Sequence, residues 1–307
     1  MLDINEVGCD WGRLRRTLGS AVDEPAREFM LQVGGVRFHV VEWGEPRDPP
    51  VLLLHGRSAN AISWHRLAMG LADRYRVVAF DQRGHGLSDW PGRYTDRLLV
   101  GDVVRMVEAV GLTHFALIGH SMGGAIAWEY GARNPDRVDC LVLLDANPDP
   151  SGEAEPDEPD PPFPSGLASP DELVEWAAAQ GWTEGIDTGD ANRWLTRHVR
   201  WSPEGWSPGF DQEGYADAYA SGRMWQSTRA DWRDISRITC PTLVVVGENE
   251  KGGVGQELGR FLVQRLTRGS LAFIPNTGHL VHWHDLPATL AAVQPFLAAT
   301  SSRTLSD

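Results

Sequence analysis

A short motif near the middle of the chain has the residue types and the spacing of a nucleophilic site. Residues 119–123 read Gly-His-Ser-Met-Gly, with an apolar run before them at 116–118 and a helix-compatible segment after them at 125–130. A serine on so sharp a strand-to-helix turn has a strained backbone and a hydroxyl that projects above the sheet. We therefore predict Ser121 as a nucleophile, with the Met122 N–H donating to the negative charge that develops beside it.

A serine hydroxyl is a weak nucleophile at neutral pH and requires a neighbouring base. His279 is the candidate base, because it follows an apolar segment, 270–274, and a glycine. In open α/β sheets ligands bind at the carboxyl ends of the strands, and a loop that follows a strand reaches this edge. His282 and His284 lie close by, but no acidic or thiol cluster accompanies them with metal-ligand spacing. We predict His279 as the general base and expect no metal site.

Apolar runs separate these reactive residues and indicate buried strands. Runs that are apolar on both faces, alternating with segments of helical periodicity, are typical of a parallel sheet covered by helices. Two further strands at the N-terminal end meet at Gly34-Gly35, which predicts a hairpin. The predicted strands are 29–33, 36–43, 51–54, 76–80, 116–118, 141–144, 243–246 and 270–274.

Composition and charge narrow the class of protein. The chain has 307 residues and is 42% hydrophobic, which suits one large domain with an insertion. Its formal net charge of −14 argues against a nucleic-acid partner. No apolar run approaches the roughly 18 residues of a membrane span, and the N-terminal segment lacks the pattern of a signal peptide. Cys9, Cys140 and Cys240 have no metal-ligand spacing, so we expect reduced thiols in a cytoplasmic protein.

The alternation of strands and helices stops at Pro148. Residues 149–165 are rich in Pro, Asp and Glu, which is typical of a flexible linker. Helical segments are predicted beyond it, and 148–235 contains seven of the 13 tryptophans. We predict that Trp176 and Trp225 line the roof of a substrate pocket, the alternative being that these tryptophans form only a core of their own. The expected domains are an extension over 1–28, a core over 29–147 and 236–307, and a helical cap over 148–235.

Five motifs follow one another, each at the end of a predicted strand, and together they resemble the α/β-hydrolase superfamily in its capped serine-hydrolase form. The resemblance covers nearly all of 29–299. It implies a mostly parallel eight-stranded sheet flanked by helices, with a helical cap inserted after the strand that ends at Asp145. The motifs are His55-Gly56, Asp81-x-Arg83-Gly84-His85-Gly86-x-Ser88, Gly119-His120-Ser121-Met122-Gly123-Gly124, the segment from Pro241-Thr242 to Gly247-Glu248-Asn249-Glu250, and Gly278-His279.

The acid that orients the histidine is the point where this chain departs from the family. Such hydrolases usually have an aspartate on the loop after the strand 243–246, and here Glu250 occupies that position. A known alternative in the family is an acid at the end of the preceding strand, where Asp145 lies. We predict Glu250 as the acid, with Asp145 as the alternative.

The resemblance also assigns the second oxyanion donor to the backbone N–H of Arg57. The Arg57 side chain either forms an ion pair with a carboxylate of the protein or recognises a carboxylate or polar carbonyl of the substrate. We expect both Arg57 and His120 to shape the substrate site. His85 is interpreted as a turn residue.

These observations predict a serine hydrolase that cleaves an ester or lactone through an acyl-enzyme, without a metal or an organic cofactor. The expected substrate is a small, largely apolar molecule. One alternative is a carbon–carbon bond hydrolase of a diketone-like substrate, for which Trp283-His284 is suggestive but Arg57-Ser58 lacks the usual glycine-rich loop. An alternative of another class is a ligand-binding receptor without turnover. The sequence has no signature of an oligomeric state.

Overall fold

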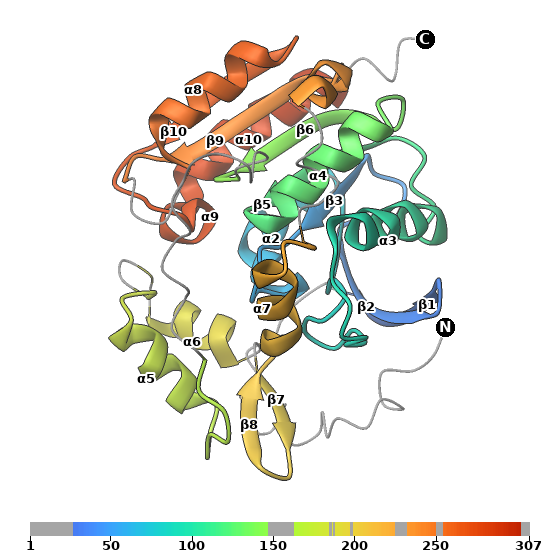
Figure 1. Ribbon diagram of the computed structural model, residues 1–307. Coiled ribbons are helices and arrows are strands. Elements are labelled where there is room, and N and C mark those ends of the chain that lie inside the picture. The colour runs from blue at the N-terminus through green and yellow to red at the C-terminus, as the bar shows by residue number, and fades with distance from the viewer. Residues whose placement is uncertain are drawn as a thin grey trace.

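The computed structural model describes residues 27–146, 163–183, 186, 188–196, 199–224, 232–249 and 254–301. One eight-stranded sheet has the order β1-β2-β4-β3-β5-β6-β9-β10 (Figure 1). The β1–β2 and β2–β4 pairs are antiparallel, and all other pairs in this order are parallel. The mostly parallel eight-stranded sheet is therefore confirmed. Its strands are β1 (Arg27–Val33), β2 (Val36–Trp43), β3 (Pro50–Leu54), β4 (Arg76–Phe80), β5 (Phe115–His120), β6 (Val138–Leu144), β9 (Thr242–Gly247) and β10 (Gly269–Ile274).

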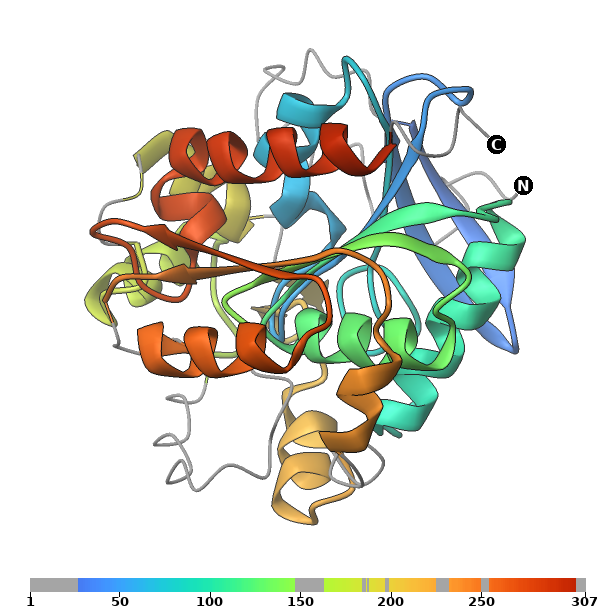
Figure 2. The same ribbon diagram turned by 90° about the horizontal axis from the view of Figure 1, so that it is seen from above.

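Helices cover both faces of this sheet, which explains why the central strands are apolar on both sides (Figure 2). Residues 51–54 of β3, for example, are fully buried. Such runs remove apolar surface from water on both faces, which stabilises the fold by about 25 cal/mol per Å². One face packs against η2 (Ala61–Trp64), α2 (His65–Leu71), α9 (Val281–His284) and α10 (Leu286–Ser301), and the other against α3 (Asp96–Ala109), α4 (Met122–Arg133) and α8 (Gly255–Arg265).

The hairpin predicted at the N-terminal end is present between β1 and β2. Gly34 and Gly35 have φ values of 58° and 85°. Two consecutive positive φ angles define the turn whose twist matches that of paired strands, and glycine adopts them without strain.

Two cysteines are buried thiols without a disulfide bond. Burial raises the pKa of Cys140 to about 12 and that of Cys240 to about 11. Both are therefore protonated at neutral pH and have little nucleophilic character. Cys9 lies outside the described residues.

Of the elements between β6 and β9, which we call the cap segment, α5, α6, β7 and β8 lie together at the lower end of the molecule in Figure 1, with α7 above the hairpin. The sequence predicted only helices here, but β7 and β8 form an antiparallel hairpin. Its strands pair Trp201 with Trp206, and aromatic side chains favour strands. Gly205 has a φ of 121°, which a residue with a Cβ rarely adopts. The cap segment consists of α5 (Asp171–Ala179), α6 (Thr188–Thr196), β7 (Val199–Ser202), β8 (Gly205–Pro208), α7 (Gln212–Ala220) and η4 (Trp232–Arg237).

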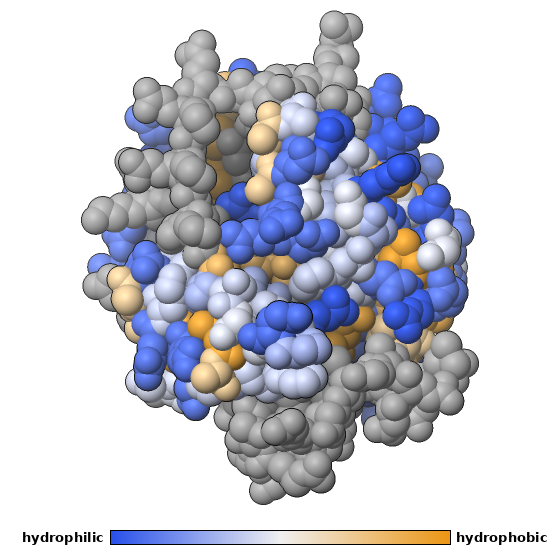
Figure 3. Space-filling model, turned by 60° about the horizontal axis from the view of Figure 1, so that its bottom comes forward, coloured by the Kyte–Doolittle hydropathy of each residue, from blue (hydrophilic) through white to orange (hydrophobic). Residues whose placement is uncertain are grey.

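Seen from this end, the surface is largely hydrophilic, with hydrophobic residues in small scattered patches (Figure 3). This agrees with the net charge of −14. Within the described ranges, no helix is both long and apolar enough to cross a bilayer. Residues 1–26 of the extension predicted over 1–28, and residues 149–162 of the linker predicted over 149–165, lie outside these ranges.

Candidate active site

Ser121 lies on the tight turn between β5 and α4, where the sequence predicted it. Its φ is 51° and its ψ is −122°, a conformation that is unfavourable for a residue with a side chain. The turn is possible because the two flanking glycines lie against backbone. A Cβ at Gly119 would lie 2.4 Å from the Gly123 oxygen, and a Cβ at Gly123 would lie 2.1 Å from the Leu54 oxygen. Both glycines are therefore required by close packing of the turn.

Two of the three glycines of α4, Gly123 and Gly131, provide a test of this packing. Gly123→Ala is expected to lower the free energy of unfolding by about 3 kcal/mol, since backbone must move to admit the methyl group. A Cβ at Gly131 would have its nearest contact 3.9 Å away, at the Leu141 side chain. Gly131→Ala is therefore expected to raise the free energy of unfolding by about 0.5–1 kcal/mol. Urea denaturation of both variants measures the difference, and equal effects would contradict the steric argument.

His279 and Asp145 form a hydrogen-bonded pair at the carboxyl end of the sheet. The His279 Nδ1 lies 2.7 Å from the Asp145 Oδ2. Asp145 is buried, whereas 34% of the His279 side chain is exposed. Because a carboxylate oxygen accepts, the histidine proton lies on Nδ1 and its Nε2 presents a lone pair outward. This is the tautomer that a general base requires.

Backbone amides also hold the Asp145 carboxylate. The N–H of Val254 donates to it at 3.3 Å, and the N–H of Gly247 donates at 3.4 Å. These bonds give the buried carboxylate hydrogen-bond donors in addition to the His279 ring. Asp145 itself has a φ of 43°, so a second residue of this group has a strained backbone.

The favoured acid of the sequence analysis, Glu250, lies outside the described residues. Glu248, two residues earlier, accepts a hydrogen bond from the N–H of Asn276 at 3.2 Å. Among the residues that the structure describes, Asp145 is the carboxylate in contact with the His279 ring. Asp145, the alternative acid of the sequence analysis, therefore has the contact that this role requires.

His120 connects the serine turn to the His279 loop. Its Nε2–H donates to the His279 carbonyl oxygen at 2.9 Å, and the two rings lie 4.7 Å apart. Burial, with the nearby His279 and His282, lowers the pKa of His120 well below its usual value, so it is neutral. The sequence analysis expected His120 to shape the substrate site, and its buried ring holds the His279 loop in place.

The segment after β3 packs directly against the serine turn between β5 and α4. A Cβ at Gly56 would lie 2.8 Å from the His120 Nδ1 and 3.3 Å from the Ser121 Cβ. The His55 Nδ1–H donates to the Gly56 oxygen at 2.8 Å, and the Gln82 N–H donates to the His55 Nε2 at 2.9 Å. Burial lowers the pKa of His55, which agrees with this neutral tautomer. The position of Gly56 is thereby fixed beside the serine.

Arg57 follows this fixed glycine and is exposed. Its guanidinium carbon lies 5.0 Å from the centre of the Tyr219 ring, on α7 of the cap segment. A cation over an aromatic face at this distance is attracted to it. The Arg57 side chain therefore lies between the core and the cap segment.

Half-buried aromatic side chains of the cap segment gather close to the residue that follows His279. The Trp176 ring lies 4.8 Å from that of Phe163 and 5.2 Å from that of Trp182. Trp176, Trp182 and Leu280 pack against one small apolar cluster that contains the buried Trp283. The other tryptophan that was predicted to bind substrate, Trp225, lies outside the described residues.

Within the described part of the chain, no group of three or more His, Cys, Asp or Glu side chains is arranged to hold a metal ion. His282 is buried, stacks on Trp64 at 4.7 Å and has a pKa lowered by burial to about 3. A neutral histidine packed in this way is a core residue.

Comparison with known proteins identifies the family. The model of the alpha/beta hydrolase fold family matches residues 49–286, which is most of the chain. The chain therefore belongs to the alpha/beta hydrolase fold family. The five motifs of the sequence analysis all lie within or at the border of this match.

Curated relatives are similar over part of their length. The chain is 39% identical to epoxide hydrolase 3 of Xenopus tropicalis over 124 residues, which is 39% of this chain and 34% of that protein. It is 41% identical to a serine hydrolase-like protein of Homo sapiens over 121 residues, which is 38% of this chain and 60% of that protein. The alignments thus span between about a third and three fifths of these relatives. Their names support a place for this chain among enzymes of the hydrolase class.

Solved structures share the fold at low identity. The thioesterase domain from the curacin biosynthetic pathway has a TM-score of 0.74 at 21% identity, covering 89% of this chain and 100% of that one. The enol-lactonase from Burkholderia xenovorans LB400 has a TM-score of 0.66 at 20% identity, covering 88% and 100%. These likenesses establish the fold alone.

Proposed function

We propose that this protein is a serine hydrolase that cleaves a small ester or lactone through an acyl-enzyme. In this proposal Ser121 is the nucleophile, His279 the general base and Asp145 the acid, so that Asp145 takes the role first predicted for Glu250. The observation that carries the proposal is the 2.7 Å contact between His279 and Asp145. It occurs at the sheet edge where the strained Ser121 lies, and His120 ties the two together.

The chemistry runs in two steps. Ser121 Oγ attacks the substrate carbonyl carbon while His279 Nε2 accepts the hydroxyl proton, and buried Asp145 stabilises the imidazolium. The tetrahedral intermediate collapses, and His279 returns the proton to the leaving alcohol oxygen. Water then attacks the acyl-enzyme with His279 again as base, releasing the carboxylic acid. In a lactone, the leaving oxygen and the acid belong to the same product molecule.

Two backbone N–H groups are suited to stabilise the oxyanion. Met122 is the first residue of α4, and the first N–H groups of a helix have no intrahelical acceptor. The N–H of Arg57 shares a peptide plane with the Gly56 carbonyl, and His55 holds that carbonyl. N–H donors whose positions are fixed before the reaction stabilise the negative charge that develops in the transition state, which lowers the activation free energy. We propose these two groups as the oxyanion hole.

The cap segment supports an apolar acyl or lactone ring as substrate. Phe163, Trp176 and Trp182 are only half-buried, and they cluster close to Leu280, beside the proposed base. Ligand pockets are lined mainly by apolar and aromatic side chains with a few polar groups. We propose that these rings contact the apolar part of the substrate.

Epoxide opening is a weaker candidate, although some relatives bear that name. Attack on an epoxide by a serine oxygen would form an ether, which water cannot readily cleave. A carboxylate nucleophile would form an ester, which can be hydrolysed. The serine at position 121 therefore favours acyl transfer.

A labelling experiment followed by a substrate panel tests the proposal. A fluorophosphonate probe is expected to label the wild-type protein at Ser121 and to leave Ser121→Ala unlabelled. The panel contains nitrophenyl esters of increasing acyl length, γ- and δ-lactones, a 1,5-diketone and styrene oxide, and we expect turnover of the esters or lactones. Turnover of styrene oxide alone, or labelling without turnover of any substrate, would contradict it.

Arg57 provides a test of substrate charge. If its guanidinium binds a substrate carboxylate, Arg57→Ala is expected to raise KM for acidic esters by a factor that corresponds to about 1.5–3 kcal/mol. The KM for neutral esters of the same length should change little. Arg57→Lys retains the charge and serves as the control. An equal loss on neutral and acidic esters would show instead that the oxyanion hole is disturbed.

A further inference from the structure

His85 lies in the turn after β4, between two glycines whose φ values are 74° and 51°. Its ring is fully buried. It packs edge-on against His55 at 4.9 Å and stacks on Phe210 of the cap segment at 5.8 Å. The turn and the cap segment are also joined by backbone, since the Gly86 N–H donates to the Gly209 oxygen at 2.6 Å. The ring is thus held between the core and the cap segment.

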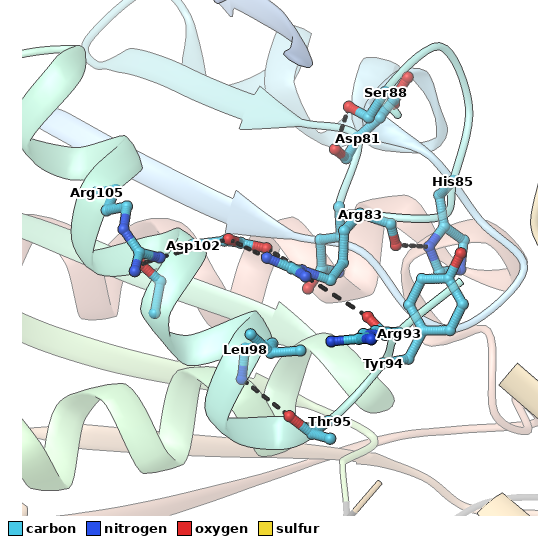
Figure 4. A network of polar contacts seen from close by, with 12 residues as sticks. Asp81, Arg83, His85, Ser88, Arg93, Tyr94, Thr95, Leu98, Asp102 and Arg105 are labelled. Carbon is cyan, nitrogen blue, oxygen red and sulfur yellow. Dashed lines mark hydrogen bonds and ion pairs between the residues drawn. The ribbon is translucent and has the colours of Figure 1, made fainter. Parts of the chain in front are cut away.

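Both ring nitrogens of His85 have partners that fix its protonation. Nδ1 lies 3.2 Å from the Arg83 oxygen, which can only accept (Figure 4). Nε2 lies 3.2 Å from the backbone N–H of Ser58, which can only donate. The proton therefore lies on Nδ1, and Nε2 accepts. Arg83 is itself held by an ion pair with Asp102 of α3, so its carbonyl is a fixed acceptor.

The acceptor on His85, its Nε2, matters because of the conformation of Ser58. Its φ is 60°, in the left-handed region that residues with a Cβ avoid. It follows Arg57 directly, and its Oγ–H donates to the Arg57 oxygen at 2.6 Å. The peptide plane before Arg57 is fixed by His55, and the plane after it is fixed by His85. The Arg57 N–H lies in the first plane, and the second plane restrains how the first can rotate about the Arg57 Cα.

We propose that His85 is a positioning residue for the oxyanion hole: by accepting the Ser58 N–H it maintains the strained conformation that orients the Arg57 N–H. The inference rests on the proposed function, in which that N–H faces the developing oxyanion. A donor that acts only on the transition state affects kcat and leaves substrate binding nearly unchanged.

The first test compares two substitutions of the ring. His85→Phe keeps the stacking on Phe210 but removes both nitrogens, and His85→Gln can place an amide oxygen close to the former Nε2. With p-nitrophenyl butyrate, His85→Phe is expected to lower kcat by a factor on the order of 10–100, with KM changed less than about threefold. His85→Gln is expected to retain most of kcat. Equal kcat values in the two variants would overturn the proposal.

The second test uses the strain at Ser58. Glycine adopts a positive φ without strain, whereas alanine does not. The loss of kcat caused by His85→Phe is therefore expected to be several times smaller in a Ser58→Gly background than in a Ser58→Ala background. A loss that is the same in both backgrounds would show that His85 does not act through Ser58.

A third measurement does not depend on activity. Amide hydrogen exchange at Ser58, followed by ¹H–¹⁵N spectra, is expected to become at least tenfold faster in His85→Phe, while the amides of β3 remain protected. Unchanged exchange at Ser58 overturns the positioning role even if the enzyme is active. If the Ser58 amide exchanges faster in His85→Phe but fluorophosphonate does not label the wild-type protein, the positioning role is supported and the proposed function is rejected.

Discussion

Ser121→Ala is expected to reduce kcat for an ester or lactone substrate by a factor on the order of 10⁶, which is about the loss seen when a serine nucleophile is removed. The reason is chemical, because no acyl-enzyme can form without the Oγ atom. The residual rate would come from the oxyanion hole and from substrate binding. Steady-state kinetics on purified protein measure the effect.

The fold of this variant should be intact, since alanine removes one half-buried oxygen from a turn fixed by glycines. An unchanged circular dichroism spectrum and thermal midpoint provide the control. Retention of a tenth of the wild-type kcat would exclude Ser121 as the nucleophile.

The second large effect concerns the acid. Asp145→Asn keeps the shape of the side chain but cannot stabilise the imidazolium, and it favours the wrong histidine tautomer. We expect kcat to fall by about 10⁴, by analogy with aspartate-to-asparagine changes in serine triads. Glu250→Gln, a matched loss of one carboxylate charge, is expected to change kcat less than about tenfold. Both variants are measured on the same ester at the same pH.

A pH profile separates a direct role of Asp145 from a loss of structure. The kcat of the wild type and of Asp145→Asn is measured across the pH range, because a general base accepts a proton only in its unprotonated form. If Asp145 orients the ring, Asp145→Asn should lower the plateau of this profile while the protein remains folded. The reverse ranking of the two variants would return the acid to Glu250.

The position of the serine was predictable because local sequence determines it. A glycine pair around Ser121 and apolar runs on both sides are required by the turn and the strands themselves, and the structure has both. A parallel sheet followed from strands apolar on both faces, since a sheet covered by helices on both sides buries them. The eight strands were implied by the resemblance to the α/β-hydrolase superfamily.

The carboxylate that contacts His279 was not predictable in the same way. β6 and β9 are neighbours in the sheet, with Leu144 paired to Val245, so their carboxyl ends lie side by side. Carboxylates that follow either strand are candidates to reach His279. Which one makes the contact depends on the path of loops that are distant in sequence, and no local pattern encodes it.

The role that we propose for His85 was missed for a related reason. Its position between two glycines favoured a simple turn, and the turn is present. The acceptor role of Nε2 becomes visible only when the segment after β3 is placed beside the turn after β4. One feature of the sequence could have indicated this contact. Both His55 and His85 follow buried strands of the sheet.

Three residues of the proposed machinery, Ser58, Ser121 and Asp145, share a left-handed backbone. Each such residue lowers stability by about 1–3 kcal/mol, and glycine would relieve most of this. Random mutagenesis selected only for heat resistance would therefore enrich glycine at positions 121 and 145, and the survivors would be robust but inactive. A directed-evolution library on this scaffold must therefore be selected on turnover as well as on heat.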